Sequence, residues 1–216
     1  QGAALTPGDM LAALTGPDLM ANRYPIVTQS WLSARAQSLT QAKKRMKTDP
    51  AGQADFDAIA AEVKAATDAA LRATLARAID AADAFRERLV AFWADHFTVA
   101  AFGQENGASS YTFVEDAIRP HLSGPFAAML TAATRHPAMM TFLDQTRSVG
   151  PTSPSGVKKG LGLNENLARE LLELHTLGIG AAYSQTDVRQ LAELLTGLAY
   201  DDRRGAYFDA RRAEPG

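Results

Sequence analysis

The 216-residue sequence contains no cysteine. Disulfide bonds, thiolate metal sites and cysteine nucleophiles are therefore all excluded for this chain. The absence does not fix a cellular compartment. An oxidising periplasm, where unpaired thiols are a hazard, and an ordinary cytosol both accommodate proteins without cysteine.

The sequence also lacks a long hydrophobic run and a large net charge. No stretch approaches the roughly 20 apolar residues that a membrane-spanning helix requires. Lysine and arginine number 22 and aspartate and glutamate 24, which leaves a formal net charge of -2. No global electrostatic field would hold such a chain on nucleic acid or on an anionic membrane. We therefore expect neither a membrane span nor nucleic-acid binding.

Apolar residues make up 46% of the sequence, recur mainly with helical spacing and are separated by Gly and Pro breaks. The pattern predicts an all-α protein, an irregular multi-helix bundle of roughly eight to ten helices, with no strand. We expect a single helical domain over residues 1–216, divisible into an N-terminal helical subdomain (1–80), a motif-bearing core (81–200) and an irregular tail (201–216). Residues 145–163, rich in Gly, Pro, Ser and Lys, are predicted to be a mobile surface loop.

The stretch 164–178 is the most strongly patterned segment. Asn164 is a favourable N-cap, and Gly178 stands where a left-handed residue ends a helix. At about 100° per residue, five apolar residues share one broad arc: Leu167, Ala168, Leu171, Leu172 and Leu174. His175 falls within the same arc, so the helix is predicted to bury an imidazole together with its leucines.

A second helix, predicted from Phe85 to Val99 after a break near Asp80 to Asp83, also directs a histidine inward. His96 shares an arc with six apolar residues: Phe85, Leu89, Val90, Phe92, Trp93 and Phe97. A third helix, from Ser184 to Ala199, opens with a capping-box pattern in which Asp187 is the N3 residue. We expect these three helices to form the packed centre of the protein.

His96 and His175 suggest the sharpest chemical hypothesis. Imidazoles buried between helices bind Zn²⁺ or transfer protons, and facing helices can assemble such a site. A metal, however, needs at least three protein ligands, and neither histidine belongs to a His-x-x-x-His or Glu-x-x-His pair. Core histidines bonded to a carbonyl or a side chain explain the pattern better, so we predict no metal site and no cofactor.

Polar residues of the 164–178 segment complete the candidate site. Glu165, Arg169 and Glu173 are spaced four apart and form one row, with Glu170 beside it. Such a row is usually a solvated ion-pair ladder, and its functional interpretation is a polar surface that docks a partner. The catalytic residues are unassigned, and the candidate functional cluster is Trp93, His96, Asn164, Glu165, Arg169, Glu170, Glu173 and His175.

A separate anion-binding hypothesis rests on Lys158, Lys159, Gly160 and Gly162, which lead into the helix at Asn164. Glycines and free N–H groups at a helix start bind phosphate or sulfate. Against this, a glutamate in the first turn would repel an anion. No predicted strand precedes the glycines either, so they form neither a Walker loop nor a dinucleotide fingerprint.

Four segments carry a resemblance to a known family: Phe92 to Phe97, His136 to Met139 with Leu143-Asp144, Asn164 to Gly178, and Tyr183 to Gly197. They resemble the domain of unknown function 1800 family of bacteria, and the resemblance covers most of the chain from Leu89 onward. The family has no established activity.

The resemblance implies several further properties. Family members are usually much longer, so the chain is expected to be a fragment. They often carry export signals, which implies a periplasmic or extracellular location, with the cytoplasm as the other option. They are often encoded beside a family that resembles alkaline phosphatases and sulfatases, which implies a protein partner of that kind. Ala213 stands where a family segment often written His-Glu-Pro-Gly has its histidine, and this weakens any proposal that needs a ligand there.

Two function hypotheses follow. The first is a non-enzymatic binding or scaffold module that acts with a partner protein. The alternative is a metal-dependent or acid/base hydrolase whose site lies between the helices bearing His96 and His175. The sequence leaves open whether the chain is an enzyme.

Overall fold

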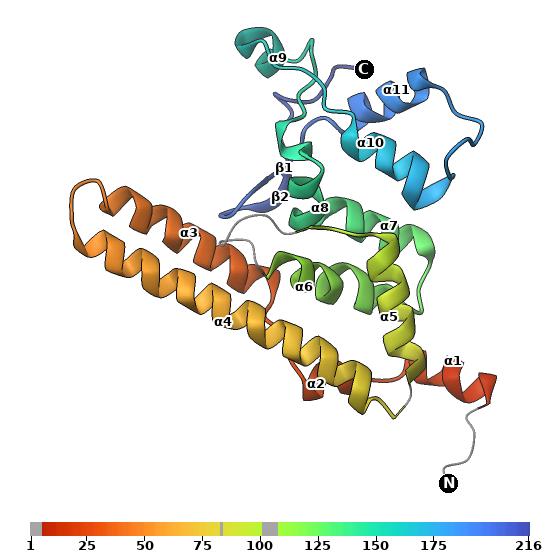
Figure 1. Ribbon diagram of the computed structural model, residues 1–216. Helices are drawn as coiled ribbons and strands as arrows, with labels where there is room; N and C mark the ends of the chain where they lie inside the picture. Colours follow the sequence, from red (N-terminus) through yellow and green to blue (C-terminus); the bar gives the residue numbers. More distant parts are fainter. Residues whose placement is uncertain (1–5, 83, 101–107) are drawn as a thin grey trace. The chain divides into compact units, whose positions relative to one another are not determined.

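The computed structural model describes residues 6–82, 84–100 and 108–216 (Figure 1). The chain forms two compact units, unit 1 (Gln1–Ala132) and unit 2 (Ala133–Gly216). Across the described residues there are eleven α-helices and one two-stranded sheet, so the predicted all-α class is confirmed. No helix in this described part is both long and apolar enough to span a membrane. The single-domain description of residues 1–216 stays a prediction.

Unit 1 begins with two short helices whose starts are set by capping side chains. Helix α1 (Pro7–Thr15) opens with a reciprocal capping box between Thr6 and Asp9. Helix α2 (Leu19–Arg23) opens with Asp18, whose Oδ1 accepts the backbone N–H of Ala21 at 2.9 Å. These caps replace the backbone acceptors that a first helical turn lacks.

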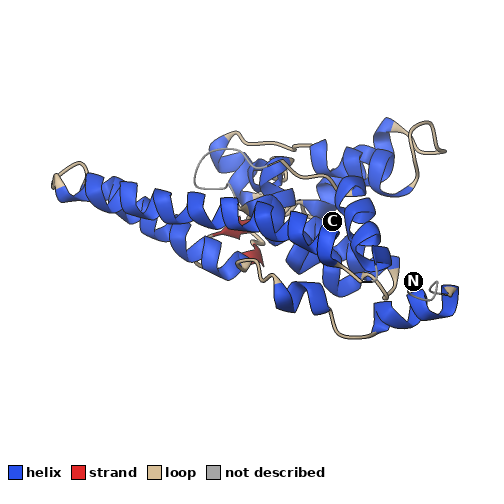
Figure 2. Ribbon diagram, turned by 60° about the horizontal axis from the view of Figure 1, so that its bottom comes forward, coloured by secondary structure: helices blue, strands red, loops and turns tan. Residues whose placement is uncertain are grey.

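Helices α3 (Gln29–Arg45) and α4 (Ala51–Asp80) run side by side as a long pair (Figures 1 and 2). Leu32 of α3 and Val63 of α4 are buried in the cluster that holds the pair together. In the first turn of α4, a Cβ on Gly52 would lie 2.4 Å from the backbone nitrogen of Met46, just after α3. Only glycine therefore fits where the two backbones approach each other.

Helix α5 (Ala84–His96) follows the break expected near Asp80 to Asp83. Next come α6 (Ser109–Phe113), a π-helical turn η2 (Val114–Ile118) and a 3-10 turn η3 (Arg119–His121). Phe92 was predicted in the buried arc of α5, yet its side chain is 58% exposed. The apolar arc of α5 is wider than the face that its neighbours cover. Helix α7 (Phe126–Arg135) contains the boundary between the units.

Unit 2 opens with α8 (Pro137–Phe142), which His136 caps by accepting the N–H of Ala138 on Nδ1 at 3.1 Å. A 3-10 turn η4 (Gln145–Arg147) and α9 (Pro154–Lys159) follow.

The prediction of a surface loop over 145–163 is wrong, because the segment contains α9 and several buried residues: Gln145, Ser148, Val149, Ser153 and Gly156. A Cβ on Gly150 would lie 2.6 Å from the Cα of Glu214. The glycine therefore permits a close contact between two backbones and does not mark a mobile segment.

The most strongly patterned segment forms α10 (Asn166–Glu170) and then a π-helical turn η5 (Leu171–Thr176). The predicted N-cap is misplaced: Glu165 occupies that position without a side-chain cap, and the Asn164 Oδ1 accepts the N–H of Asn166 at 2.9 Å. Leu174, expected in the buried arc, is 53% exposed. A π-helical turn holds more residues than an α-turn, so a wheel drawn at the α-helical period fails here.

Helix α11 (Gln185–Leu195) begins with the predicted capping box of Ser184 and Asp187. It ends before Ala199, because Gly197 has a φ of +85° and turns the chain into a hairpin. Strand β1 (Leu198–Asp201) pairs antiparallel with β2 (Gly205–Phe208). The expectation of no strand, and of an irregular tail after residue 200, is therefore wrong at this hairpin.

Candidate functional site

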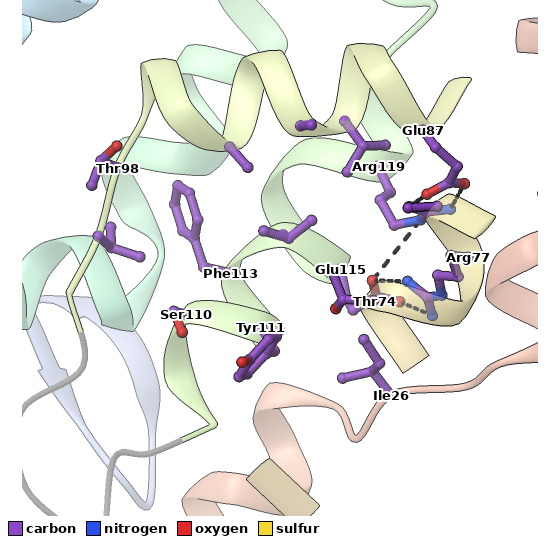
Figure 3. A pocket seen from close by; sticks show the side chains of 16 residues that line it. Ile26, Thr74, Arg77, Glu87, Thr98, Ser110, Tyr111, Phe113, Glu115 and Arg119 are labelled. Carbon is purple, nitrogen blue, oxygen red and sulfur yellow. Dashed lines mark hydrogen bonds and ion pairs between the residues drawn. The ribbon is translucent and has the colours of Figure 1, made fainter. Parts of the chain in front are cut away.

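Unit 1 contains a cavity of about 320 Å³ between α4, α5, α6 and η2 (Figure 3). Most of its wall is apolar: Ile26, Ala78, Val90, Ala91, Ala94, Val99, Phe113 and Val114. Four charged side chains gather at one end: Arg77, Glu87, Glu115 and Arg119 (Figure 3). The cavity is thus a mostly hydrophobic space with one strongly polar end, the usual composition of a small-molecule site.

Arg119 is held by four hydrogen bonds to two carboxylates. Its Nε and Nη2 donate to Asp18 at 2.9 and 3.0 Å, and its Nη1 and Nη2 donate to Glu87 at 2.9 and 2.7 Å. The residue is only 6% exposed. A guanidinium that is hydrogen-bonded along two edges in this way has a fixed orientation. Its bonds connect η3, which carries Arg119, to the start of α2 and to α5.

Arg77 is equally immobilised. Its Nε and Nη2 donate to the carbonyl of Tyr24 at 3.0 and 2.6 Å, and its Nη1 and Nη2 donate to Glu115 at 2.6 and 3.1 Å. Glu115 also lies 3.9 Å from Nε of Arg119, so the two pairs join in one network. We call Asp18, Arg77, Glu87, Glu115 and Arg119 the ion-pair network.

The electrostatics of the ion-pair network keep its central members charged. Burial alone would raise the pKa of Asp18, but hydrogen bonds from Arg119 and from the Ala21 N–H lower it below its ordinary value. Burial alone would lower the pKa of Arg119, and its bonds to Glu87 and Asp18 outweigh that effect and raise it. Asp18 is therefore a carboxylate at neutral pH and has no proton to give as a general acid.

Sequence reasoning missed the ion-pair network entirely. Asp18 and Arg119 are 101 residues apart, and Arg77 and Glu115 are 38 apart, so no local spacing connects them. The one local signal is the i,i+4 spacing of Glu115 and Arg119. That spacing occurs on many solvated helix surfaces and does not indicate burial.

Trp93 and His96 lie together in an aromatic cluster on α5. The ring centroid of His96 is 5.3 Å from that of Trp93, 4.7 Å from that of Phe97 and 6.4 Å from that of Phe126. His96 is only partly buried, whereas Phe97 is fully buried. The imidazole is therefore packed edge-on against other rings at the margin of the core.

His175 lies in η5 and is 5% exposed, so its predicted burial is confirmed. His96 belongs to unit 1 and His175 to unit 2. Among residues 6–82, 84–100 and 108–216, no group of three or more His, Asp or Glu side chains is placed to hold a metal ion. The metal-dependent form of the hydrolase hypothesis therefore has no ligand set among these described residues.

The predicted polar row of α10 forms as an ion-pair ladder. Arg169 donates to Glu173 at 3.1 Å and to Glu165 at 3.4 Å. Gln185, at the start of α11, accepts a bond from Arg169 at 2.9 Å and donates to Glu165 at 2.7 Å. The ladder therefore fastens α10 to α11, which gives it a structural role. Glu170, beside it, is half-buried.

The predicted anion site at the start of α10 does not form in the way that the sequence suggested. The N–H of Asn164 donates to the hydroxyl of Ser148, and the N–H of Asn166 donates to the Oδ1 of Asn164. Neither group is therefore free to bind an anion. Gly160, with a φ of +62°, ends α9, and the carbonyl of Gly162 accepts the N–H of Val149. Lys158 and Lys159, however, line a separate cavity in unit 2.

The described structure defines a helical protein with a mostly apolar cavity, closed at one end by structural ion pairs. Residues 9–216 match the family described as "Protein of unknown function (DUF1800)", and the chain belongs to that family. Neither a curated protein nor a solved structure matches the chain.

Proposed function

We propose that this chain is a non-enzymatic binding module and that the cavity of unit 1 receives its ligand. The observation that carries the proposal is the ion-pair network at one end of a mostly apolar cavity. Its arginines each donate to two different partners, so the polar end is rigid before any ligand arrives. Rigid polar groups beside an apolar wall favour binding because little conformational entropy is lost.

The charges of the network favour a particular ligand chemistry. Among the residues that line the polar end, two guanidinium groups face two carboxylates, so that end carries no net charge. Each carboxylate accepts two hydrogen bonds from an arginine and has lone pairs left to accept from a ligand. A small, largely apolar molecule with a hydrogen-bond donor at one end complements such a site.

A neutral solvatochromic dye such as Nile red tests the cavity directly. The dye should bind the wild type saturably with a rise in emission. Ala94→Leu, which places extra methyl groups in the cavity wall, should weaken binding about tenfold. Ala65→Leu, on an exposed part of α4 outside the cavity, is the matched control and should bind as the wild type does. No saturable binding, or equal weakening by both substitutions, would refute the proposal.

The hydrolase alternative predicts a different result. It requires His96 and His175 to share a metal or a proton, and its metal-dependent form requires stoichiometric metal that is lost in His175→Ala. Metal analysis of the purified wild type and of this variant separates the two functions. A variant that is merely less stable, from a wild type without any bound metal, counts against the metal-dependent hydrolase.

We also propose, from the family resemblance, that the protein is exported to the periplasm or beyond. We further propose that it acts with a protein resembling alkaline phosphatases and sulfatases. The partnership is tested by co-expressing this chain with an alkaline phosphatase-like or sulfatase-like protein encoded beside it, followed by size-exclusion chromatography. Separate elution of the two proteins at micromolar concentration contradicts it.

A further inference from the structure

A second cavity, of about 740 Å³, lies in unit 2 and is lined by η4, α9 and the segment 209–212. We call it the basic cleft because five of its lining residues are cationic: Arg147, Lys158, Lys159, Arg211 and Arg212. Its apolar wall is formed by Val149, Pro154 and Leu161. The cleft is therefore much larger than an inorganic anion and combines positive charge with hydrophobic surface.

Only two of the five cations are neutralised by carboxylates of the described residues. Arg147 pairs with Asp144 at 3.2 Å, and Arg211 pairs with Asp209 at 3.1 Å. Lys158 and Lys159 are exposed and have no ion-pair partner in the described part of the chain. Together with Arg212, they leave a surplus of three positive charges in one cleft.

Arg212 is the fixed member of this set. Its Nη2 donates to the carbonyls of Thr146 and Ser148, which anchors the guanidinium to η4 and to the residue that follows it. No described residue accepts a hydrogen bond from its Nη1, so that nitrogen is left to donate to a ligand. A positioned guanidinium beside two exposed ammonium groups is a common arrangement for recognising phosphate or sulfate oxygens.

The backbone holds the walls of the basic cleft together. The N–H of Gly150 donates to the carbonyl of Arg212 at 2.8 Å, and the N–H of Ser155 donates to the carbonyl of Arg211 at 2.9 Å. Ser153 caps α9 through the N–H of Gly156 at 3.1 Å. The helix that bears both lysines is thus tied to the segment that bears Arg212, so these charges line one cleft without reorganisation of the fold.

We propose that the basic cleft binds an organic phosphate or sulfate ester. Its oxyanion would meet Arg212, Lys158 and Lys159, and its apolar body would lie on Val149, Pro154 and Leu161. A nucleic-acid strand fits less well, because no aromatic residue lines the cleft to stack a base and the chain as a whole carries a net charge of -2. The proposal does not depend on the cavity of unit 1.

Calorimetric titration of the whole chain with phenyl phosphate and phenyl sulfate at low salt tests this site. At least one ester should bind saturably to the wild type. Lys158→Gln/Lys159→Gln, which alters exposed side chains at the end of α9, should weaken its binding about tenfold. Lys44→Gln/Lys47→Gln removes the same charge from an exposed part of unit 1 and should leave binding unchanged. Circular dichroism verifies that both variants are folded.

Three outcomes would overturn the proposal. The wild type would bind neither ester at millimolar concentration, or both double variants would weaken binding equally, which indicates a non-specific charge effect. The third is that inorganic phosphate binds as tightly as the better ester, which would remove the role of the apolar wall. None of these results bears on Nile red binding in unit 1, so the two proposals fail separately.

Discussion

Replacing Arg119 with methionine removes the guanidinium at the centre of the ion-pair network and keeps an unbranched side chain as far as the position of Nε. Four hydrogen bonds of 2.7 to 3.0 Å are lost, and Asp18 and Glu87 keep their charges without the guanidinium. Breaking one side of a buried ion pair costs about 3–5 kcal/mol. The carboxylates are 22% and 11% exposed, so water recovers part of their solvation, and we expect about 3 kcal/mol.

Urea unfolding followed by circular dichroism at neutral pH measures this loss. Arg45→Met is the matched control, because Arg45 also pairs with two carboxylates, Asp49 and Asp55, but all three side chains are roughly half exposed. An exposed pair contributes less than about 1 kcal/mol, so the control should unfold almost as the wild type does.

The pH dependence of the same comparison tests the electrostatic cause. The pKa of Asp18 is lowered in the folded wild type, so its contribution to stability is complete above about pH 4 and is lost as pH falls through the folded pKa. Arg119→Met lacks the part of this contribution that the guanidinium supplies and keeps only the part that comes from the Ala21 N–H. The difference in unfolding free energy between the two proteins should therefore narrow below about pH 4. A loss under about 1 kcal/mol at neutral pH, or a difference that does not change with pH, would refute the reasoning.

Three further predictions concern packing and caps, and each uses urea unfolding as its measurement. Gly150→Ala should destabilise unit 2 by about 2 kcal/mol or more, because the added Cβ would collide with the backbone of Glu214. Gly162→Ala is the control, since its Cβ would meet no atom within 4 Å, and it should change stability by less than about 0.5 kcal/mol. Equal effects of the two substitutions would contradict the close contact at Gly150. Ser184→Ala should cost about 1 kcal/mol by removing the cap of α11, and an unchanged midpoint would count against that cap. Val63→Ala should cost about 2 kcal/mol because the side chain is fully buried, while Val157→Ala, at a site 73% exposed, should cost almost nothing; similar losses at the two valines would be inconsistent with the described core.

Local chemistry made much of the fold predictable. The break after Asp80 and the capping box of Ser184 and Asp187 each depend on residues within a few positions of one another, and both are confirmed. The segment 145–163 was misjudged because glycine, proline and serine are typical both of mobile loops and of close backbone packing. Only the packing of Glu214 against Gly150 in the folded structure distinguishes a mobile loop from a closely packed segment here. Glu214 lies far along the chain, so no local pattern contains that information.

The candidate sites divide in the same way. The burial of His175 agrees with the helical period, although that period fails for Leu174 in the same turn, and the ladder around Arg169 was predicted from spacings of four residues. Arg119 looks like any surface arginine in the sequence, because its partners at positions 18 and 87 lie far along the chain. The sequence indicates an anion site at the two lysines of α9. It does not indicate that Arg212 belongs to the same site, because only the fold places residues 209–212 beside α9.

The contacts of Glu214 and Arg212 set an order for assembly during synthesis. The ribosome releases the chain from its N-terminus, so α3 and α4, adjacent in sequence, are free to pair as soon as both have emerged. Thr152, by contrast, hydrogen-bonds to Glu214, which lies 62 residues later in the chain. Until Glu214 has been synthesised, Gly150 and its neighbours lack the backbone that they pack against in the folded unit. Unit 2 therefore completes these contacts only when residue 214 has left the exit tunnel, and until then the N–H groups of Gly150 and Thr152 stay exposed to solvent.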